Sequence, residues 1–568
     1  MVNIKRRTVL GGGLATTLGM LMPHAVAKPA PRLSNFTAVA HADGKGKMPA
    51  LASEYEYQVM LPWGDPLQTG GPAFTYPPNA DHQPQQIGIG HDGMAFFSMG
   101  ERRGLLAINH EYGRNAHVLG FNTPRNHADV LTSQAAHGLS VVEIAEQDGI
   151  WSNQESEYAR RIHVNSPVEF SGPVANHRLL KNPANNTYQG TISNCANGRT
   201  PWGTYLTCEE NFNLYFGSAG SFTATPNQKR YGFTTYGGGY GWHLFDPRFD
   251  LSDKDYVNEG NRFGWVIEID PMNPKAKPVK RTALGRFKHE GATAVEAHDG
   301  RLLVYMGDDS RFEFIYRYVS VHPWRKMVQE GISPLDEGQL YVARFNDNGL
   351  GEWLLMDISN KILSNEFIDQ AEVLVNARVA ATLLGATPMD RPEWITKGLA
   401  GYMYCSLTNN DDREQPNAAN QQAPNPHGHI IRFRDHLAGQ HFLWETFLKS
   451  DDHYLAEDSL SSPDGLWADP DGRLFIATDG DQREGLNNQL LVADTTTGEL
   501  RRLLTGVPDC EITGFTTTPD RRTMFVNIQH PGKGHPSRTN FPNPVDGTTV
   551  PRDCTLAIRR KDGGVVGS

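Results

Sequence analysis

Six short segments of the chain begin with an acid or a thiol and end in an acidic or polar cluster. Each combines a short strand, a Gly, Asp or Pro turn and an apolar strand. This pattern predicts a β-hairpin whose two open ends lie side by side. The segments run from Asp92 to Glu111, Cys195 to Glu209 and Glu210, Glu290 to Asp308 and Asp309, Glu393 to Asn409 and Asn410, Asp464 to Asp479, and Glu511 to His530. Their open ends predict a shared polynuclear metal site, because carboxylate, thiolate and imidazole groups are common metal ligands.

The residue types indicate which ions such a site would hold. Carboxylate oxygens favour hard cations, calcium above all in an exported protein. Cys195 occupies an opening position that other copies give to Asp or Glu, so we interpret it as a thiolate ligand; the alternative is a small buried apolar residue. A thiolate indicates a softer, redox-capable ion such as iron. We therefore expect iron and calcium together. Cys208, Cys405 and Cys510 lie in or beside predicted strands and are expected in the core.

An arginine accompanies the fourth opening acid. Arg391 stands two positions before Glu393, on a segment stiffened by Pro392. The guanidinium fork matches phosphate or carboxylate oxygens, so Arg391 is a candidate for binding an anionic ligand beside the metals. A salt bridge to a neighbouring acid explains the same residue equally well. His110 and His289 flank the clusters, where hydrogen bonding is as good an interpretation as metal ligation.

Two of the closing clusters are adjacent acids at strand ends, Glu209–Glu210 and Asp308–Asp309. Adjacent strand residues point to opposite faces. One member of each pair could therefore face a central channel while its neighbour faces a flanking metal. Repulsion between carboxylates in a buried site would be relieved by cations.

The elements that position these residues are predicted to be β-strands throughout. One β unit repeated along a long chain predicts an all-β fold, a six-bladed β-propeller with helical and loop insertions between blades. Apolar segments such as 141–144, 265–269 and 489–494 are expected as outer blade strands. Helical spacing appears over 365–384 and part of 320–330, and long loops are expected at 236–241 and 409–426. Residues 28–54 are predicted to form an extended lead-in and residues 55–568 the propeller domain.

The first 27 residues are predicted to be a signal peptide. Lys5, Arg6 and Arg7 precede an apolar, Gly-rich stretch, and Ala25-Val26-Ala27 forms a cleavage site. The arginine pair indicates the twin-arginine export machinery; an ordinary secretory signal is the alternative. No later run is long and apolar enough to span a bilayer. A soluble, monomeric periplasmic or secreted protein without a membrane anchor is expected.

The net charge argues against two classes of partner. The chain carries a formal charge of −11, and loss of the three basic leader residues gives −11 − 3 = −14. A net-negative chain is a poor candidate for binding nucleic acid or anionic membranes.

Several longer blocks of sequence resemble the PhoX family of periplasmic alkaline phosphatases. The blocks are NHEYG (109–113), NCANGRTPWGTYLTCEEN (194–211), HEGATAVE (289–296), VYMGDDSRFEFIYRYV (304–319), RPEW (391–394), SSPDGLWADPDGRLFIATDG (461–480) and CEITGFTTTPD (510–520). The resemblance runs through most of the mature chain and implies a six-bladed propeller that holds iron and calcium and hydrolyses phosphate monoesters.

The resemblance also implies roles for individual residues. Cys195 would be the iron-ligating thiolate and Arg391 the phosphate-contacting arginine, with Glu290 beside them at the catalytic centre. Metal ligands would be Cys195, Glu209, Glu210, Glu290, Asp308, Glu393, Asp464, Asp479 and Glu511, to which the repeat adds Glu111, Asp309 and His530.

The expected chemistry is phosphoryl transfer to water, with attack by a metal-bound hydroxide or oxo group and no serine nucleophile. Most contacts would go to the phosphoryl group, so a broad range of small phosphate esters is expected as substrates. Two alternatives remain at this stage. One is a calcium-dependent lactonase of the gluconolactonase type, and the other is a non-catalytic calcium-binding propeller. Neither explains Cys195 or the number of acids.

Overall fold

The computed structural model describes residues 34–435 and 439–568. The predicted signal peptide, 1–27, lies outside the described residues. The described chain is mostly β-sheet, and all its strand pairs are antiparallel except that of β8 with β12. Among these residues, no helix is both long enough and apolar enough to cross a membrane.

Three sheets each begin with a hairpin from the repeat. The first contains β3 (His91–Gly100), β4 (Arg103–His110), β5 (Gly138–Gln147) and β6 (Ile150–Asn153), with β7 (Arg160–Ile162) also paired to β5. The second contains β9 (Asn194–Arg199), β10 (Tyr205–Glu209), β11 (Val266–Ile269), β12 (Val279–Arg281) and β8 (Glu169–Ser171). The third contains β22 (Pro463–Ala468), β23 (Arg473–Thr478), β24 (Gln489–Asp494), β25 (Leu500–Thr505) and β1 (Ala50–Leu51).

The other three hairpins lie in two sheets. One sheet contains β26 (Glu511–Thr517), β27 (Thr523–Gln529), β28 (Cys554–Arg560) and β2 (Tyr55–Met60), so the two ends of the described chain meet in it. The nine-stranded sheet contains β13 (His289–Glu296), β14 (Arg301–Asp308), β15 (Ile315–Pro323), β16 (Gly338–Phe345), β17 (Leu350–Leu355), β21 (His441–Lys449), β20 (His429–Asp435), β19 (Tyr402–Leu407) and β18 (Pro392–Lys397). Pairing of β17 with β21 therefore joins two hairpin units into one sheet.

All six hairpins contain the same irregularity near the opening acid. Two residues of the first strand lie where the second strand has one, as at residues 92–93 between His91 and Met94 in β3 and at residues 393–394 between Pro392 and Ile395 in β18. The same register shift occurs in β9, β13, β22 and β26. An extra residue on one strand is a β-bulge, which bends the strand and turns a side chain away from its regular face. The repeat is thus a bulged hairpin.

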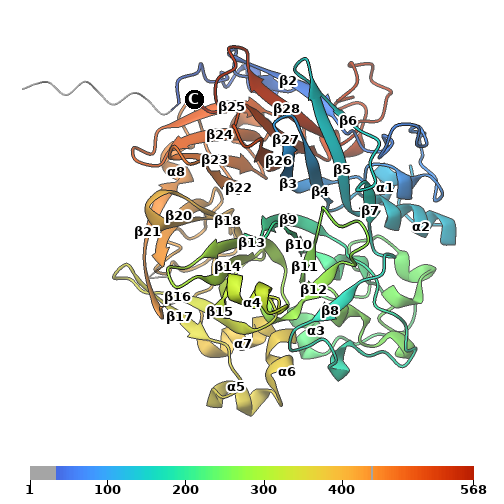
Figure 1. Cartoon of the computed structure of the whole chain (residues 1–568), viewed down its shortest axis with the longest axis vertical. Helices are drawn as coiled ribbons and strands as arrows, with labels where there is room; N and C mark the ends of the chain where they lie inside the picture. Colours follow the sequence, from blue (N-terminus) through green and yellow to red (C-terminus); the bar gives the residue numbers. More distant parts are fainter. Residues whose placement is uncertain (1–33, 436–438) are drawn as a thin grey trace, which may run out of the picture. The chain divides into compact units, whose positions relative to one another are not determined.

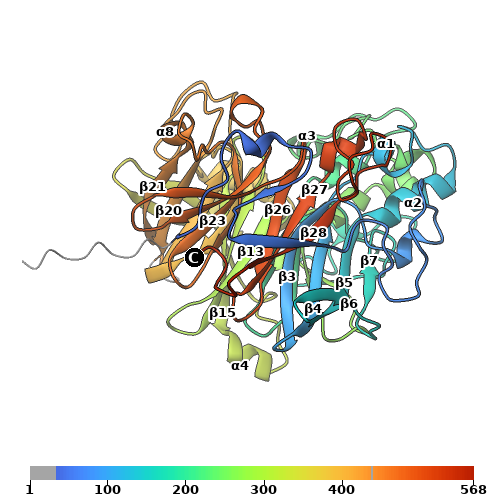
Figure 2. The same ribbon diagram turned by 90° about the horizontal axis from the view of Figure 1, so that it is seen from above.

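The first strands of the hairpins lie beside one another. In Figure 1 they occupy the middle of the view, with the later strands of each sheet outside them, and in Figure 2 β26 lies next to β3. Backbones approach closely at these contacts: a Cβ on Gly514 would lie 2.4 Å from the Asp92 carbonyl oxygen. Glycine is required there because no side chain fits between the two strands.

Apolar side chains on both faces of the middle strands form the core between sheets. Every residue of β23 and β27 is buried. One buried cluster joins the sheet that contains β24 and β25 to the sheet that contains β27 and β28. It includes Val492, Leu504, Val526 and Leu556. Each such side chain contributes about 1.5–3 kcal/mol when fully buried, which makes the sheets a rigid support for the strand ends.

The helices lie between strands or between sheets. They are α1 (Asn115–Val118), α2 (His127–Ala136), α3 (Pro226–Arg230), α4 (Trp324–Gln329), α5 (Lys361–Glu366), α6 (Gln370–Val375), α7 (Ala377–Leu384) and α8 (Ser450–His453). The predicted helix over 365–384 is broken into the end of α5, α6 and α7. Only the second half of 320–330 is helical, because β15 continues to Pro323. Residues 236–241 and 409–426 contain no helix or strand.

Two expectations about strand placement need correction. The three apolar segments predicted as outer strands form β5, β11 and β24, and each has a further strand on its outer side. The described part of the lead-in is more than an extended segment: it contributes β1 to a sheet, and Phe36 and Val39 to a buried cluster. Apolarity alone does not show that a strand is the outermost one: here the next strand of the chain, β6, β12 or β25, pairs on the outer side of each.

Candidate metal centre

The ends of the hairpins converge on a connected group of acids. Four sets of three residues each place one ligand atom per residue within 4.8 Å of the others. The sets are Asp92, Glu111 and Cys195; Cys195, Glu210 and Glu290; Glu290, Glu393 and Asp464; and Asp464, Asp479 and Glu511. Because neighbouring sets share Cys195, Glu290 or Asp464, they form one continuous chain of potential ligands. All six hairpins contribute to it.

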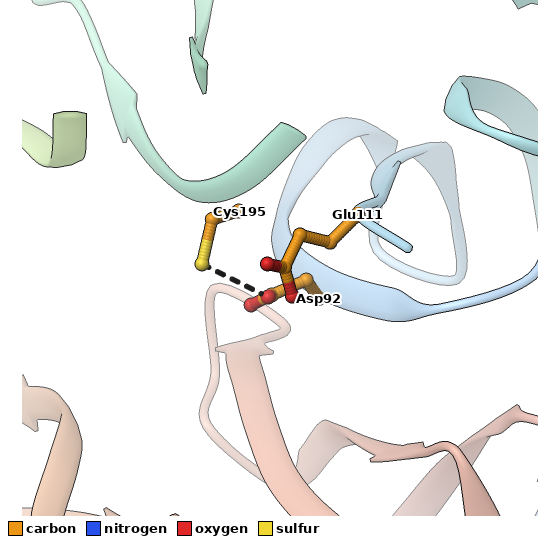
Figure 3. Close-up of side chains that lie close together, drawn as sticks. All are labelled: Asp92, Glu111 and Cys195. Carbon is orange, nitrogen blue, oxygen red and sulfur yellow. Dashed lines mark hydrogen bonds between the residues drawn. The ribbon is translucent and has the colours of Figure 1, made fainter. Parts of the chain in front are cut away.

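Cys195 joins the first two sets. Its Sγ lies 3.1 Å from Asp92 Oδ2 and 3.2 Å from Glu290 Oε1. Figure 3 shows the thiol pointing from its strand towards Asp92 and Glu111. All five cysteines are unpaired and buried, but only Cys195 lies among acids. Cys208, Cys405 and Cys510 are in the core, as predicted.

Polar side chains behind the acids fix their positions. Gln529 Nε2 donates to Asp92 Oδ2 at 3.2 Å and to Glu111 Oε2 at 3.1 Å. Thr408 Oγ1 lies 2.9 Å from Glu393 Oε1. Gln529 is the last residue of β27, and Thr408 directly follows β19. These two hairpins therefore each supply an acid of the cluster and a polar side chain that orients an acid.

Burial makes this arrangement of acids electrostatically unfavourable without cations. Burial raises the pKa of Asp92 to about 6 and, with help from the charge of Asp309, raises that of Glu210 to about 8. Burial and neighbouring acids raise the pKa values of Glu290 and Glu393 well above the usual range. Burial and the charge of Asp92 do the same for the Cys195 thiol. Bound cations would stabilise all these groups in their charged forms.

The donor set fits bound metal ions. Asp464 Oδ1 is buried and has no hydrogen-bond partner among the described residues, although Asp464 belongs to two of the sets. A buried carboxylate oxygen without a donor is costly, and coordination to a cation would satisfy it. The cluster is therefore capable of binding metal ions.

Arg391 lies against the cluster and makes the salt bridges that one interpretation of this residue predicts. Its Nε and Nη2 donate to the two carboxylate oxygens of Asp309 at 2.9 Å each, and Nη2 lies 2.9 Å from Glu393 Oε1. Burial alone would raise the pKa of Asp309, but Arg391 lowers it below its usual value. Nη1 has no partner within the described chain, and the side chain is 24% exposed. Arg391 therefore makes salt bridges and still presents one free edge.

The adjacent acid pairs divide their members between two environments. Glu210 and Asp309 face the centre, whereas Glu209 and Asp308 do not. Glu209 Oε1 pairs with the buried Lys280 Nζ at 2.8 Å, and its other oxygen accepts from two backbone amides. Asp308 accepts two hydrogen bonds from Arg378. Glu209 and Asp308, both predicted as metal ligands, therefore lie outside the four sets and are held by cations of the protein itself.

Several other predicted residues lie outside the four sets. His530 Nε2 is 3.5 Å from Glu511 Oε2, and its Nδ1 is 2.9 Å from the Asp509 carbonyl, so it supports Glu511 from behind. His110 and His289 are buried and hydrogen-bonded to Ser140 and to the Gly285 carbonyl, respectively. Asn410 of the fourth closing cluster binds Asp390 instead of facing the acids.

A cavity of about 720 Å³ opens over the acids and Arg391. Its walls include residues that sequence reasoning missed: Tyr112, Arg114, Asn115, Tyr240, Lys533 and His535. Asp92 opens the first hairpin but is not among the predicted metal ligands, although its position in the bulge matches that of Cys195. Its position in the repeat is the sequence signal that identifies it as a candidate ligand.

The fold and the site together define a class of protein: an antiparallel β protein whose sheet ends form a centre for several metal ions, beside an arginine suited to an anion. Comparison with known proteins gives a more particular result. The model of the family described as alkaline phosphatase PhoX matches residues 34–532. The chain thus belongs to the PhoX alkaline phosphatase family, and it is a metal-dependent phosphomonoesterase.

One solved structure is similar over nearly the whole chain. Pseudomonas fluorescens PhoX in complex with vanadate, a transition state analogue, is 42% identical, with a TM-score of 0.89 over 94% of this chain and 100% of that one. A Dyadobacter fermentans protein of unknown function is 11% identical (TM-score 0.37; 84% and 97% coverage). A gluconolactonase from Xanthomonas campestris is also 11% identical (TM-score 0.32; 90% and 96% coverage). The last two are too dissimilar to bear on function. None of the curated proteins compared with the chain matches it.

Proposed function

We propose that the four linked sets hold a mixed cluster of iron and calcium, with the Cys195 thiolate as an iron ligand. A thiolate favours a softer ion and an all-carboxylate set favours calcium. The set of Glu290, Glu393 and Asp464 and the set of Asp464, Asp479 and Glu511 contain only carboxylates, whereas the other two contain Cys195. The ligand chemistry thus divides the cluster into a thiolate end and a carboxylate end. When bound, the ions supply positive charge for the phosphoryl oxygens and activate water.

The role proposed for Arg391 follows from its free edge. Asp309 and Glu393 hold the guanidinium from one side, so Nη1 is left to donate to a non-bridging phosphoryl oxygen. Holding the fork in advance lowers the entropy lost when the phosphate binds. Glu290, shared by two sets, would help to hold the ions on either side of it. In-line attack on phosphorus then needs no protein nucleophile, and no serine role is proposed.

The single observation that supports this function best is the continuity of the acid sets beneath a cavity that also contains Arg391. The vanadate complex of the Pseudomonas fluorescens protein is consistent with a site that binds a phosphoryl group in transfer. The acid sets and Arg391 would hold the phosphoryl group itself, so a broad range of phosphate esters is proposed as substrate.

The scaffold is proposed to be a six-bladed β-propeller. Each bulged hairpin begins one unit, consecutive first strands contact one another, and β26 contacts β3. The nine-stranded sheet would then be two blades joined through β17 and β21. We also propose that residues 1–27 are a twin-arginine signal and that the protein is exported to the periplasm as a monomer. The pair Arg6 and Arg7 supports the twin-arginine export route.

Elemental analysis of the exported protein, with hydrolysis of p-nitrophenyl phosphate measured on the same sample, tests the metal assignment. Iron together with calcium and phosphate release is expected, and vanadate should inhibit. Activity in a sample that contains calcium but no iron would overturn the role of Cys195. Substitution Arg391→Lys should raise KM for the ester while metal content stays constant, because lysine cannot provide the fork.

A further inference from the structure

The mouth of the cavity has a charge opposite to that of its floor. The floor consists of the acids of the four sets, whereas Arg114, Lys533 and His535 line the opening and are exposed. No side-chain hydrogen bond or salt bridge joins any of these three to another described residue. Arg391 is already paired with acids, so these are the basic groups of the cavity that remain available to a ligand.

Packing between two distant segments brings the basic groups together. Arg114 precedes helix α1, which packs against the turn Pro531–Gly534 that contains Lys533. A Cβ on Gly534 would lie 2.5 Å from the His117 ring, so the turn rests directly on α1. The rings of Tyr112 and His530 also lie 5.5 Å apart. The two segments are therefore held in fixed relation at the cavity mouth.

The turn that carries Lys533 has an unusual backbone. His530 and Lys533 have φ values of +39° and +49°, and both are non-glycine residues. Left-handed conformations at such residues cost about 1–3 kcal/mol each and concentrate at ligand-binding sites. Lys533 also lines a neighbouring cavity of about 560 Å³, which shares Asp479 with the first. The nearby Asp509 carboxylate is bound by Arg538, so it does not pair with Lys533.

We propose that Arg114, Lys533 and His535 form a second anion-binding subsite at the cavity mouth, which favours phosphate esters whose leaving group carries another anionic group. The proposal rests on the function proposed above, because it places the scissile phosphate on the metal cluster and Arg391. The second group would be a phosphate or a carboxylate, since all three side chains donate hydrogen bonds and two are cationic at neutral pH. Tyr240, which also lines the cavity, would contact the apolar part of the leaving group.

Matched substrates test this subsite without changing the phosphoryl chemistry. 3-(4-Phosphonooxyphenyl)propionate and its methyl ester have the same phenol leaving group and differ in one remote negative charge. The holoenzyme should hydrolyse the carboxylate with kcat/KM about 3- to 10-fold above that of the ester at low salt, as expected for a few partly exposed ion pairs. The preference should fall at high ionic strength. An analogue with a phosphonate in place of the carboxylate shows whether the subsite prefers a dianion.

Variants separate the subsite from general effects. Arg114→Gln with Lys533→Gln should remove the preference and leave kcat/KM for the methyl ester unchanged. Arg102→Gln is the control, because Arg102 is exposed at the turn between β3 and β4, the end of that hairpin away from Asp92. Equal rates for the two substrates in the unmodified enzyme, or equal losses on both in the double variant, would overturn the proposal. Failure to hydrolyse either substrate would instead count against the proposed function.

Discussion

The buried carboxylates of this protein fall into two groups that differ in what neutralises them. Glu209, Asp308 and Asp390 lie beside Lys280, Arg378 and Arg413, respectively. The closest contact is 2.8 Å for Glu209 and 2.6 Å for Asp390. The acids of the four sets are also mostly buried, yet among the described residues only two of them touch a basic side chain: Glu393 lies beside Arg391, and Glu511 lies 3.5 Å from the His530 ring. The protein thus supplies its own lysine or arginine to the first group, whereas most acids of the second group are left to the metal ions proposed above.

Cys195→Ala should produce the largest effect, because it removes the only soft ligand from the group without protein cations. We expect loss of iron and a drop in kcat of at least about 100-fold, the upper range for disturbing a metal site. Elemental analysis and p-nitrophenyl phosphate hydrolysis measure both. Cys554→Ala is the control, since Cys554 is buried outside the sets. An unchanged iron content in Cys195→Ala would contradict the ligand assignment.

The pair Glu209→Gln and Glu210→Gln compares the two groups at adjacent positions. Glu209→Gln leaves Lys280 buried and unpaired, so the free energy of unfolding should fall by about 3–5 kcal/mol. The folded fraction should keep its metal content. Glu210→Gln should instead lower metal content and activity. Denaturant unfolding and elemental analysis distinguish the outcomes, and metal loss in both variants would mean that the division between the two acids is not real.

When chelation removes bound metal ions, the stability of the protein should become dependent on pH through the acids of the four sets. The folded-state pKa values of Asp92 and Glu210, about 6 and about 8, exceed their unfolded values of about 4. The folded state then binds more protons than the unfolded state, so stability falls as pH rises from about 4 to about 8. Melting temperatures after chelation should decline over this range, whereas those of the metal-loaded protein should not. A parallel decline in both samples would show that ions do not neutralise these acids.

Asp390→Asn should have the smallest effect on activity. Asp390 binds Arg413 at 2.6 Å and two asparagines of the 409–426 loop, and it precedes Arg391, whose φ is +56°. Loosening this network should lower kcat/KM by about 10-fold, mainly through KM, with metal content unchanged. Asp435→Asn is the matched control, because the buried pair of Asp435 with Arg317 lies outside the metal cavity. Equal kinetics in the two variants would exclude a positioning role.

Much of the site could be predicted from the sequence because its ligands repeat. The opening residues lie in the bulge or within two residues of it in all six hairpins, and their types are visible directly. The orientation of the closing pairs could not be predicted, because it depends on distant residues: Lys280 is 71 positions from Glu209 and Arg378 is 70 from Asp308. The cations at the cavity mouth carry no motif. They are brought together only by the packing of α1 on a turn more than 400 positions away.

The repeated β-bulge has a consequence for how such a centre can change over evolutionary time. Each candidate ligand that opens a hairpin lies in that hairpin's own bulge or within two residues of it, so an exchange at one position leaves the other five unaffected. Cys195 and Asp92 occupy equivalent bulges. Exchange of this cysteine for an aspartate would convert the thiolate end into an all-oxygen set without altering the backbone. Metal preference could thus drift one residue at a time while the architecture is inherited intact.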